Sequence, residues 1–193
     1  DAGLEELRDA AKSCQAGKLK DKALVVSVYS KLTDEQKQSR LGEEITSLLS
    51  ISSTVQEGDK IVDAELKDIE GNIHHLSDYK GKYILLDFWS RYCGPCLDAF
   101  PLLKEIAEKH KEKVVVISLS VDPESLWKET EVKESADNWL QLSDGLGMSG
   151  IAARYGVHAL PTFIYISPES TVLKAGQGYK FLSEDIRTFI KDK

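Results

Sequence analysis

The stretch that decides the fold covers residues 83–96 and reads Tyr83-Ile84-Leu85-Leu86-Asp87-Phe88-Trp89-Ser90-Arg91-Tyr92-Cys93-Gly94-Pro95-Cys96. Residues 83–89 are mostly apolar or aromatic, which predicts a buried strand. Residues 97–110 predict a helix shortly after the two cysteines. A Cys-x-x-Cys pair between a buried strand and the start of a helix is typical of a dithiol/disulfide switch.

The position of Cys93 predicts that it is the reactive thiol. Backbone N–H groups in the first helical turn have no partner within the helix, and with the helix dipole they carry about half a positive charge. This environment favours the thiolate, which is the attacking species in disulfide exchange. Gly94 gives the turn room, and Pro95 fits a first helical turn because it lacks an N–H. Cys96, three residues on, is expected to be buried and to resolve the mixed disulfide formed at Cys93.

A static disulfide or half of a zinc site are the alternatives for this pair. A tetrahedral zinc site normally has four ligands, and the third cysteine of the chain, Cys14, is far away in the sequence. No metal site is therefore expected. Cys14 lies on an apolar helical stripe and is expected to be a buried small hydrophobe, with a third redox thiol as the alternative. His74 and His75 point to opposite faces of a strand and are expected to be exposed.

Composition limits the possible partners. The chain has 193 residues, 41% of them hydrophobic, and a net charge of −7. This length suits one domain and a smaller appendage. An acidic chain without a basic stripe argues against nucleic acid or an anionic membrane surface as a partner. No apolar run approaches the ~18 residues of a membrane span. Because the chain begins at Asp1, we expect that an N-terminal segment has been removed.

The pattern of apolar residues predicts two parts, residues 1–56 and 57–193. The first is helical, and Thr33 and Gln36 form a predicted capping box that opens a helix carrying Ile45 and Leu48. The second alternates strands (64–67, 73–76, 83–89, 114–121, 139–142, 162–167, 171–175) with helices (97–110, 125–134, 151–155, 183–191). The β-α-β order in the centre predicts parallel strands, and the terminal hairpin adds antiparallel ones.

Taken together, these motifs make residues 57–193 resemble the thioredoxin superfamily, and more closely its TlpA/ResA-like thiol–disulfide oxidoreductases of bacterial envelopes. The resemblance rests on residues 76–82, on Leu86-Asp87-Phe88-Trp89 with the cysteine pair and Pro101, and on residues 155–162. It implies an α/β, thioredoxin-like fold with a central mixed sheet flanked by helices, here preceded by the N-terminal helical segment. It also implies exchange with protein disulfides through a redox-active Cys93–Cys96 disulfide and no other cofactor.

The same resemblance implies the remaining site residues. Leu160–Pro161 is expected to be a cis peptide facing the dithiol, and the residues expected to bind substrate are Trp89, Tyr92, Gly94, Pro95, Leu160 and Pro161. Asp87 matches the buried aspartate of thioredoxins. A carboxylate desolvated in an apolar strand has a raised pKa and can take a proton from the second thiol, so Asp87 is predicted to be catalytic, with a purely structural role as the alternative.

Three positions depart from the family pattern. Tyr92 stands where a tryptophan is usual, Ala99 where TlpA-like proteins often have a glutamate, and Ser118 where many thioredoxins have a buried lysine. Tyrosine can still flank the site, so the departure at Tyr92 concerns substrate specificity rather than the basic chemistry. Arg91 can either help to keep the Cys93 thiolate charged or be a solvated loop residue, and His158 is expected in a surface loop.

The resemblance favours a reductant of protein disulfides outside the cytoplasm, in the bacterial periplasm or cell envelope. Gly94-Pro95 resembles the reducing end of the superfamily, which implies an upstream membrane electron donor and a tether through the removed segment. A peroxiredoxin-like peroxidase is one alternative, but Ser90 and Leu86 stand where that family has threonine and proline. A non-enzymatic binding module is the other.

Overall fold

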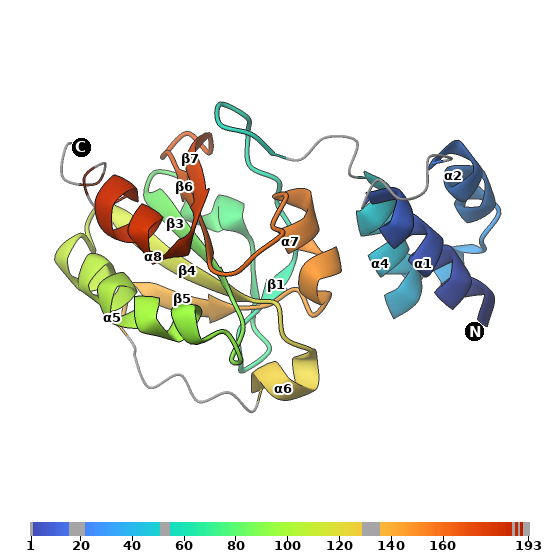
Figure 1. Ribbon diagram of the computed structural model, residues 1–193, viewed down its shortest axis with the longest axis horizontal. Coiled ribbons are helices and arrows are strands. Elements are labelled where there is room, and N and C mark those ends of the chain that lie inside the picture. The colour runs from blue at the N-terminus through green and yellow to red at the C-terminus, as the bar shows by residue number, and fades with distance from the viewer. Residues whose placement is uncertain are drawn as a thin grey trace.

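The structure is a computed structural model that describes residues 2–15, 22–50, 55–128 and 136–186, together with residues 188 and 190. Four helices form an N-terminal lobe, and the remainder of the described chain forms an α/β unit (Figure 1). The four helices are α1 (Ala2–Gln15), α2 (Lys22–Ser30), α3 (Asp34–Gln38) and α4 (Arg40–Ser50). Within the described residues, no helix is both long and apolar enough to cross a membrane.

The α/β unit is built on a mixed sheet with the strand order β5-β4-β3-β6-β7. β3 pairs in parallel with β4 and β4 with β5, whereas β6 is antiparallel to both β3 and β7. The strands are β3 (Tyr83–Trp89), β4 (Val114–Ser120), β5 (Trp139–Leu142), β6 (Thr162–Ile166) and β7 (Val172–Gln177). A separate hairpin joins β1 (Leu66–Lys67) and β2 (Ile73–His74). The predicted mixed sheet with a terminal antiparallel hairpin is confirmed.

The two central parallel strands are covered on both faces, which explains their almost unbroken apolar sequences. Side chains alternate along β3, so Leu85 and Trp89 pack in the cluster under the active-site helix while Leu86 and Phe88 pack in the cluster on the other face. Asp87 falls on the first of these faces and is fully buried. The sheet thus holds a carboxylate directly beneath the helix that carries the cysteines.

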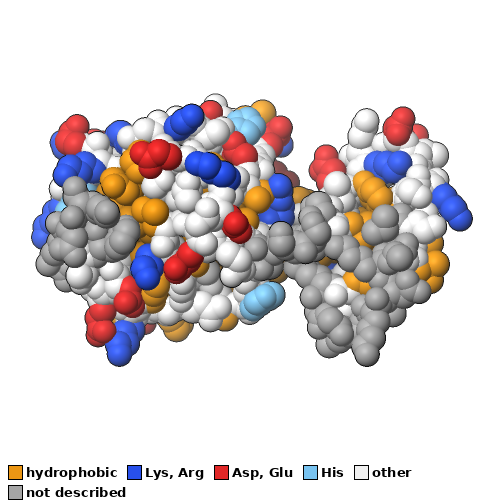
Figure 2. Space-filling view, turned by 90° about the horizontal axis from the view of Figure 1, so that it is seen from above, with side chains coloured by type: hydrophobic (Ala, Val, Ile, Leu, Met, Phe, Trp, Pro, Cys, Tyr) orange, Lys and Arg blue, Asp and Glu red, His pale blue; other side chains and the backbone are white. Residues whose placement is uncertain are grey.

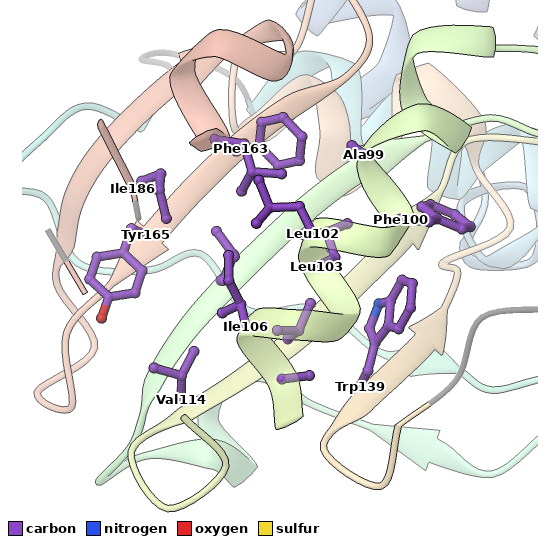
Figure 3. Packing of buried hydrophobic residues seen from close by; sticks show 14 of the residues in the cluster. Ala99, Phe100, Leu102, Leu103, Ile106, Val114, Trp139, Phe163, Tyr165 and Ile186 are labelled. Atoms are coloured by element: carbon purple, nitrogen blue, oxygen red, sulfur yellow. The ribbon is translucent and has the colours of Figure 1, made fainter. Parts of the chain in front are cut away.

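The first face is covered by α5 (Gly94–Lys109), with Pro101 inside the helix as predicted. Figure 3 shows Phe100, Leu103 and Ile106 of this helix in one cluster with the sheet residues Phe163 and Tyr165. The opposite face is covered by α7 (Ile151–Arg154) and by a 3-10 turn over Leu76–Tyr79; a further 3-10 turn, Gly147–Ser149, precedes α7.

Several helix boundaries differ from those predicted. α5 begins at Gly94 rather than at residue 97, because Cys93 serves as its N-cap. After β4, α6 covers Glu124–Lys128, and residues 129–135 of the helix predicted over 125–134 lie outside the described part of the chain. The closing helix begins before residue 183: α8 covers Gly178–Lys180 and continues into a π-helical turn, Phe181–Ile186. Gly178, at φ +80°, turns the chain out of β7 and starts this helix early.

The N-terminal lobe has its own hydrophobic core, formed by Leu4, Leu7, Ala11, Val25, Ile45 and Leu48. The predicted capping box is confirmed: Gln36 N–H donates to Thr33 Oγ1, and Gln36 Oε1 accepts from Thr33 N–H. It opens the short α3 and not the long helix that was predicted. Ser39 breaks the chain into two helices because its hydroxyl donates to the Gln36 carbonyl and accepts from Gly42 N–H, capping α4.

The two parts touch through α4 and α7, where Ser47 Oγ donates to the Gly150 carbonyl at 3.4 Å. On the face shown in Figure 2, basic and acidic side chains are interspersed over the α/β unit, so this face carries no patch of a single sign.

The division at residue 56 is a prediction that can be tested by truncation. Because the core of the N-terminal lobe is separate from the two clusters of the sheet, a chain of residues 57–193 should unfold cooperatively with a Tm within about 5 °C of the full chain. Differential scanning calorimetry measures this. As the matched control, Ile45→Ala should destabilise the N-terminal lobe by about 2–5 kcal/mol and leave the transition of the sheet in place. An insoluble or unfolded fragment contradicts the boundary.

Candidate active site

The two cysteines are joined in a disulfide at the start of α5. Their Cα atoms lie 5.2 Å apart. Cys93 is the N-cap residue and is half-buried, whereas Cys96 is fully buried. The backbone N–H of Cys96 donates to Cys93 Sγ at 3.2 Å, and Leu97 N–H donates to the Cys93 carbonyl at 3.2 Å. The predicted asymmetry, an accessible first sulfur and a buried second one, is present in the structure.

Tyr92, Gly94 and Pro95 surround the accessible sulfur. Tyr92 is 74% exposed, and Gly94 and Pro95 are also exposed. A Cβ added to Gly94 would contact nothing, and its φ is not positive, so the turn itself does not require glycine. The expectation that Gly94 is needed to make room within the turn is therefore wrong.

The Leu160–Pro161 peptide is cis, as the family resemblance implied. Thr162 follows it in β6 and pairs with Phe88, one residue before Trp89, so the cis peptide and the dithiol lie at the same end of the sheet. Leu160 is half-buried and, like Cys93, packs against the hydrophobic cluster under α5. Pro161 itself is buried, and contact of these two residues with a substrate stays a prediction.

Trp89 does not occupy such a position. Its side chain is fully buried and packs edge to face on Phe100, with ring centroids 4.9 Å apart. The alternation of side chains along β3 turns Trp89 towards α5, and Phe100 covers it there. The prediction that Trp89 forms an accessible wall for substrate is corrected: it lies in the core beneath the dithiol.

Asp87 is a buried acid near the centre of the sheet. Its Oδ2 accepts a hydrogen bond of 2.9 Å from the Ser118 hydroxyl, which itself accepts one of 2.8 Å from Trp139 Nε1–H. Burial away from water raises the pKa of Asp87 from 3.8 to about 7, and the Ser118 hydrogen bond only partly opposes this effect. A carboxyl group with this pKa can both accept and release a proton near neutral pH.

Asp122 is a functional candidate that the sequence analysis missed. It lies two residues beyond the end of β4, and its carboxylate accepts hydrogen bonds from the Ser90 hydroxyl at 2.6 Å and from Arg91 N–H at 2.8 Å. Tyr92 N–H in turn donates to Ser90 Oγ, and Cys93 N–H to the Ser90 carbonyl. One buried carboxylate thus fixes the backbone that leads into Cys93. The parallel strands β3 and β4 bring their carboxyl ends to one edge of the sheet, and this was the available signal.

The structure also assigns the other candidates. The Arg91 guanidinium donates to the Leu126 carbonyl at 3.3 Å and lies 5.5 Å from the centre of the Tyr92 ring, which makes it part of the loop packing. His158 is exposed, as expected. His74 is half-buried and hydrogen-bonded to the Tyr79 hydroxyl and to Asp68, so its predicted exposure was wrong.

Cys14 is half-buried and packs against the core of the N-terminal lobe. In the sequence it lies far from the two cysteines of the dithiol.

A disulfide between an accessible and a buried cysteine at a helix start, on a thioredoxin-like sheet, defines the chemistry of a thiol–disulfide oxidoreductase. Comparison with known proteins agrees with this class and makes it more specific. The chain belongs to the AhpC/TSA family, whose family model matches residues 57–175. The match includes both cysteines, Asp87, Asp122 and the cis proline.

Relatives and solved structures point the same way. The thioredoxin-like protein YneN of Bacillus subtilis is 31% identical over 121 residues, which cover 62% of this chain and 70% of YneN. The thiol–disulfide oxidoreductase ResA of Bacillus thuringiensis is 32% identical over 126 residues, covering 64% of this chain and 70% of ResA. The structure of the thiol:disulfide interchange protein DsbE of Chlorobium tepidum has a TM-score of 0.62 and 27% identity, covering 72% of this chain and 98% of DsbE. The exposed lipoprotein thioredoxin of Streptococcus pneumoniae has a TM-score of 0.56 and 28% identity, covering 67% of this chain and 99% of that protein.

The pKa of Asp87 predicts how stability depends on pH. Because the folded pKa of about 7 lies above the ordinary 3.8, the folded state binds more protons between these values and loses stability as pH rises through them. The loss amounts to about 4 kcal/mol and is complete above pH 7. Asp87→Asn should not show this loss. In chemical denaturation of the oxidised proteins, its free energy of unfolding should therefore rise relative to that of the wild type between pH 4 and pH 8. Asp98→Asn, at an exposed carboxylate of α5, is the control. If the difference in unfolding free energy between Asp87→Asn and the wild type does not change with pH, the raised pKa of Asp87 is contradicted.

The hydrogen bonds of Asp122 predict a second effect. Asp122→Ala leaves the Ser90 hydroxyl and Arg91 N–H without their acceptor, which should lower the free energy of unfolding by about 2–4 kcal/mol. Because the segment before Cys93 then loses its fixed position, the rate of disulfide exchange should fall about tenfold or more. Asp122→Asn keeps an acceptor oxygen and should be intermediate. Exchange at the wild-type rate in Asp122→Ala means that the carboxylate serves folding alone.

Proposed function

We propose that the Cys93–Cys96 dithiol reduces disulfides of protein substrates outside the cytoplasm. The observation that carries this proposal is the disulfide at the start of α5, with Cys93 accessible and Cys96 buried. Catalytic roles follow for Cys93, Cys96 and Asp87, and substrate contacts for Tyr92, Gly94, Pro95, Leu160 and Pro161.

The reaction begins on the reduced enzyme. The Cys93 thiolate lies at the helix start, where the Cys96 N–H is already placed to donate to its sulfur. It attacks one sulfur of the substrate disulfide, so that a Cys93–substrate bond forms and the other substrate sulfur leaves as a thiolate. Tyr92 and Pro95 on one side and Leu160 on the other border the position that the substrate chain occupies in this mixed disulfide.

Cys96 completes the exchange. Asp87 takes the proton of the Cys96 thiol, and the resulting thiolate attacks Cys93 Sγ. The Cys93–Cys96 bond forms, the Cys93–substrate bond breaks, and the substrate sulfur leaves with the electron pair. The substrate disulfide has then been reduced to two thiols and the enzyme dithiol oxidised to the disulfide that the structure contains.

The direction and location of this reaction are supported by resemblance. Gly94-Pro95 between the cysteines is similar to the reducing members of the superfamily. Among similar structures, one is named an exposed lipoprotein thioredoxin and another a thiol:disulfide interchange protein. A reductant in the periplasm or cell envelope needs an upstream membrane electron donor, and a membrane tether N-terminal to this chain would keep the domain near that donor.

A peroxidase is less well supported. Ser90 stands where a peroxiredoxin has its threonine, but its hydroxyl donates to Asp122. Leu86, where the proline of that pattern would stand, is a fully buried residue inside β3. Ser90 and Leu86 therefore both have structural roles.

The assignment of the two sulfurs is tested by trapping. In a Cys96→Ser variant, the mixed disulfide cannot be resolved, so a protein substrate should accumulate bound to Cys93 after reaction with the reduced variant. Mass spectrometry of tryptic peptides locates the adduct. Cys14→Ser is the control and should reduce substrate like the wild type. An adduct on Cys14 contradicts the mechanism.

The wild-type protein is used to test the direction of electron flow. Equilibration of the wild type with glutathione should give a reduction potential towards about −270 mV, the value of thioredoxin, whereas a value near about −120 mV would make the protein an oxidant. A full-length precursor with neither signal nor anchor contradicts the location.

A further inference from the structure

The face of the sheet opposite α5 carries a groove of about 770 Å³. Its floor is formed by β6 and β7, where Ile164 pairs with Ala175 and Thr162 pairs with Gln177. Its walls come from residues 55–57 and from the segment that follows α7. The disulfide exchange proposed above leaves this groove without a role.

The groove begins beside the cis peptide. Thr162, at the end of its floor, directly follows Pro161, and the Thr162 hydroxyl donates to the Ala159 carbonyl at 2.7 Å. Leu160 packs against the cluster under α5, which Cys93 also contacts, and against the cluster on the opposite face of the sheet. A substrate chain that is joined to Cys93 and lies over Leu160 can therefore continue around the end of the sheet into the groove.

β7 is the last strand on this side of the sheet, and its outer edge has two kinds of partner. At the end away from the cis peptide, Gly58 N–H donates to the Val172 carbonyl at 2.8 Å, and Val172 N–H donates to the Asp59 carbonyl at 2.9 Å. Nearer to the cis peptide, Ala175 N–H donates to a side chain instead, Glu57 Oε1, at 3.3 Å. A carboxylate thus stands where a neighbouring strand would present a carbonyl.

The lining of the groove is polar and carries one negative charge. Among the described residues that line it, Glu57 is the one Asp, Glu, Lys or Arg. Its side chain is exposed, and within the described part of the chain its carboxylate is bonded to Ala175 N–H and to no cation. Gln177, also exposed, adds an amide that can both donate and accept. Such a lining suits an extended peptide with a basic side chain better than an apolar ligand.

Strand geometry sets the distance from the cis peptide to Glu57. Thr162 and Ala175 are diagonal neighbours on β6 and β7, so their Cα atoms lie about 7–8 Å apart. An extended chain advances about 3.3 Å per residue, and two to three residues therefore cover this span. The substrate cysteine lies beyond Leu160, about two residues further back. A basic residue roughly three to five positions from that cysteine would meet the Glu57 carboxylate.

We propose that this groove binds the substrate chain on one side of the disulfide and that Glu57 selects a lysine or arginine in it. This inference rests on the proposed function and narrows its substrate class to disulfides with a basic residue at a fixed distance from the attacked cysteine. The net charge of −7 attracts any basic substrate, wherever its charge lies. Glu57 acts only at one distance from the cysteine, and this difference makes the inference testable.

The first measurement is the rate at which the reduced protein attacks a series of peptides. Each peptide carries one cysteine, as a mixed disulfide with thionitrobenzoate, and one lysine that is moved stepwise along the chain on either side of it. The absorbance of the released thionitrobenzoate follows the reaction. Because an exposed ion pair is weak, the rate should rise only about three- to fivefold, with a maximum where the lysine lies about three to five positions from the cysteine, on one side.

Glu57→Gln is the decisive variant, because it removes the charge and keeps an oxygen that can accept from Ala175 N–H. The maximum should disappear in Glu57→Gln. Glu169→Gln is the matched control: it changes the net charge equally, but it lies in the turn between β6 and β7, at the far end of this hairpin from the cis peptide, and should keep the maximum. A rate that does not depend on the position of the lysine, or a maximum that persists in Glu57→Gln, overturns the proposal.

A second measurement needs no reaction and separates the groove from the proposed function. The same lysine peptides with serine in place of cysteine, at millimolar concentration, should shift the backbone amide resonances of Ala175 and Gln177 in the oxidised protein and leave that of Glu169 in place. If these resonances shift but the protein does not reduce protein disulfides, the proposed function fails and the groove stands. If the protein reduces disulfides but the resonance of Ala175 does not move, the function stands and the groove is overturned.

Discussion

The packing of α5 on the buried strand β3 is the constraint on which the rest of the structure depends. β3 is covered on both faces, and α5 lies over the side that carries Leu85, Asp87 and Trp89. Because the strand ends four residues before Cys93 and the helix begins one residue after it, the cysteine is held at the edge of the sheet. The same packing buries Cys96. The different accessibility of the two sulfurs is therefore a consequence of how the core is built.

Two buried aspartates, Asp122 at this edge of the sheet and Asp87 near its centre, have different surroundings. Both oxygens of Asp122 accept hydrogen bonds from the residues that lead into Cys93, and these bonds fix the backbone conformation of that segment. Asp87 receives one hydrogen bond within the protein, and burial raises its pKa to about 7. Because burial away from water is opposed by only that one hydrogen bond, Asp87 can accept a proton near neutral pH. The surroundings of each side chain, and not its type, determine its role.

Local sequence was sufficient to predict the parts of the site that lie close together in the chain. The apolar run of β3, the cysteine spacing and the helix that follows are all read within residues 83–110. Asp122 could not be found this way, because its importance depends on which strand lies beside β3 and in what register. The break at Ser39 and the early helix at Gly178 were missed for a related reason: a side-chain cap and a positive φ acted against the helical pattern.

Asp87, Ser118 and Gln141 pair across β3, β4 and β5, and a core built for stability alone would place apolar residues at these positions. The neighbouring positions of these strands, such as Val116 and Leu142, show that the sheet accepts such residues. A chain that keeps several polar groups in its core loses folding free energy, and sites that violate the rules of packing in this way are usually those where chemistry occurs. In the proposed function, this chemistry is a proton transfer coupled to a disulfide exchange. The exchange needs an accessible sulfur, and the proton transfer needs a buried acid.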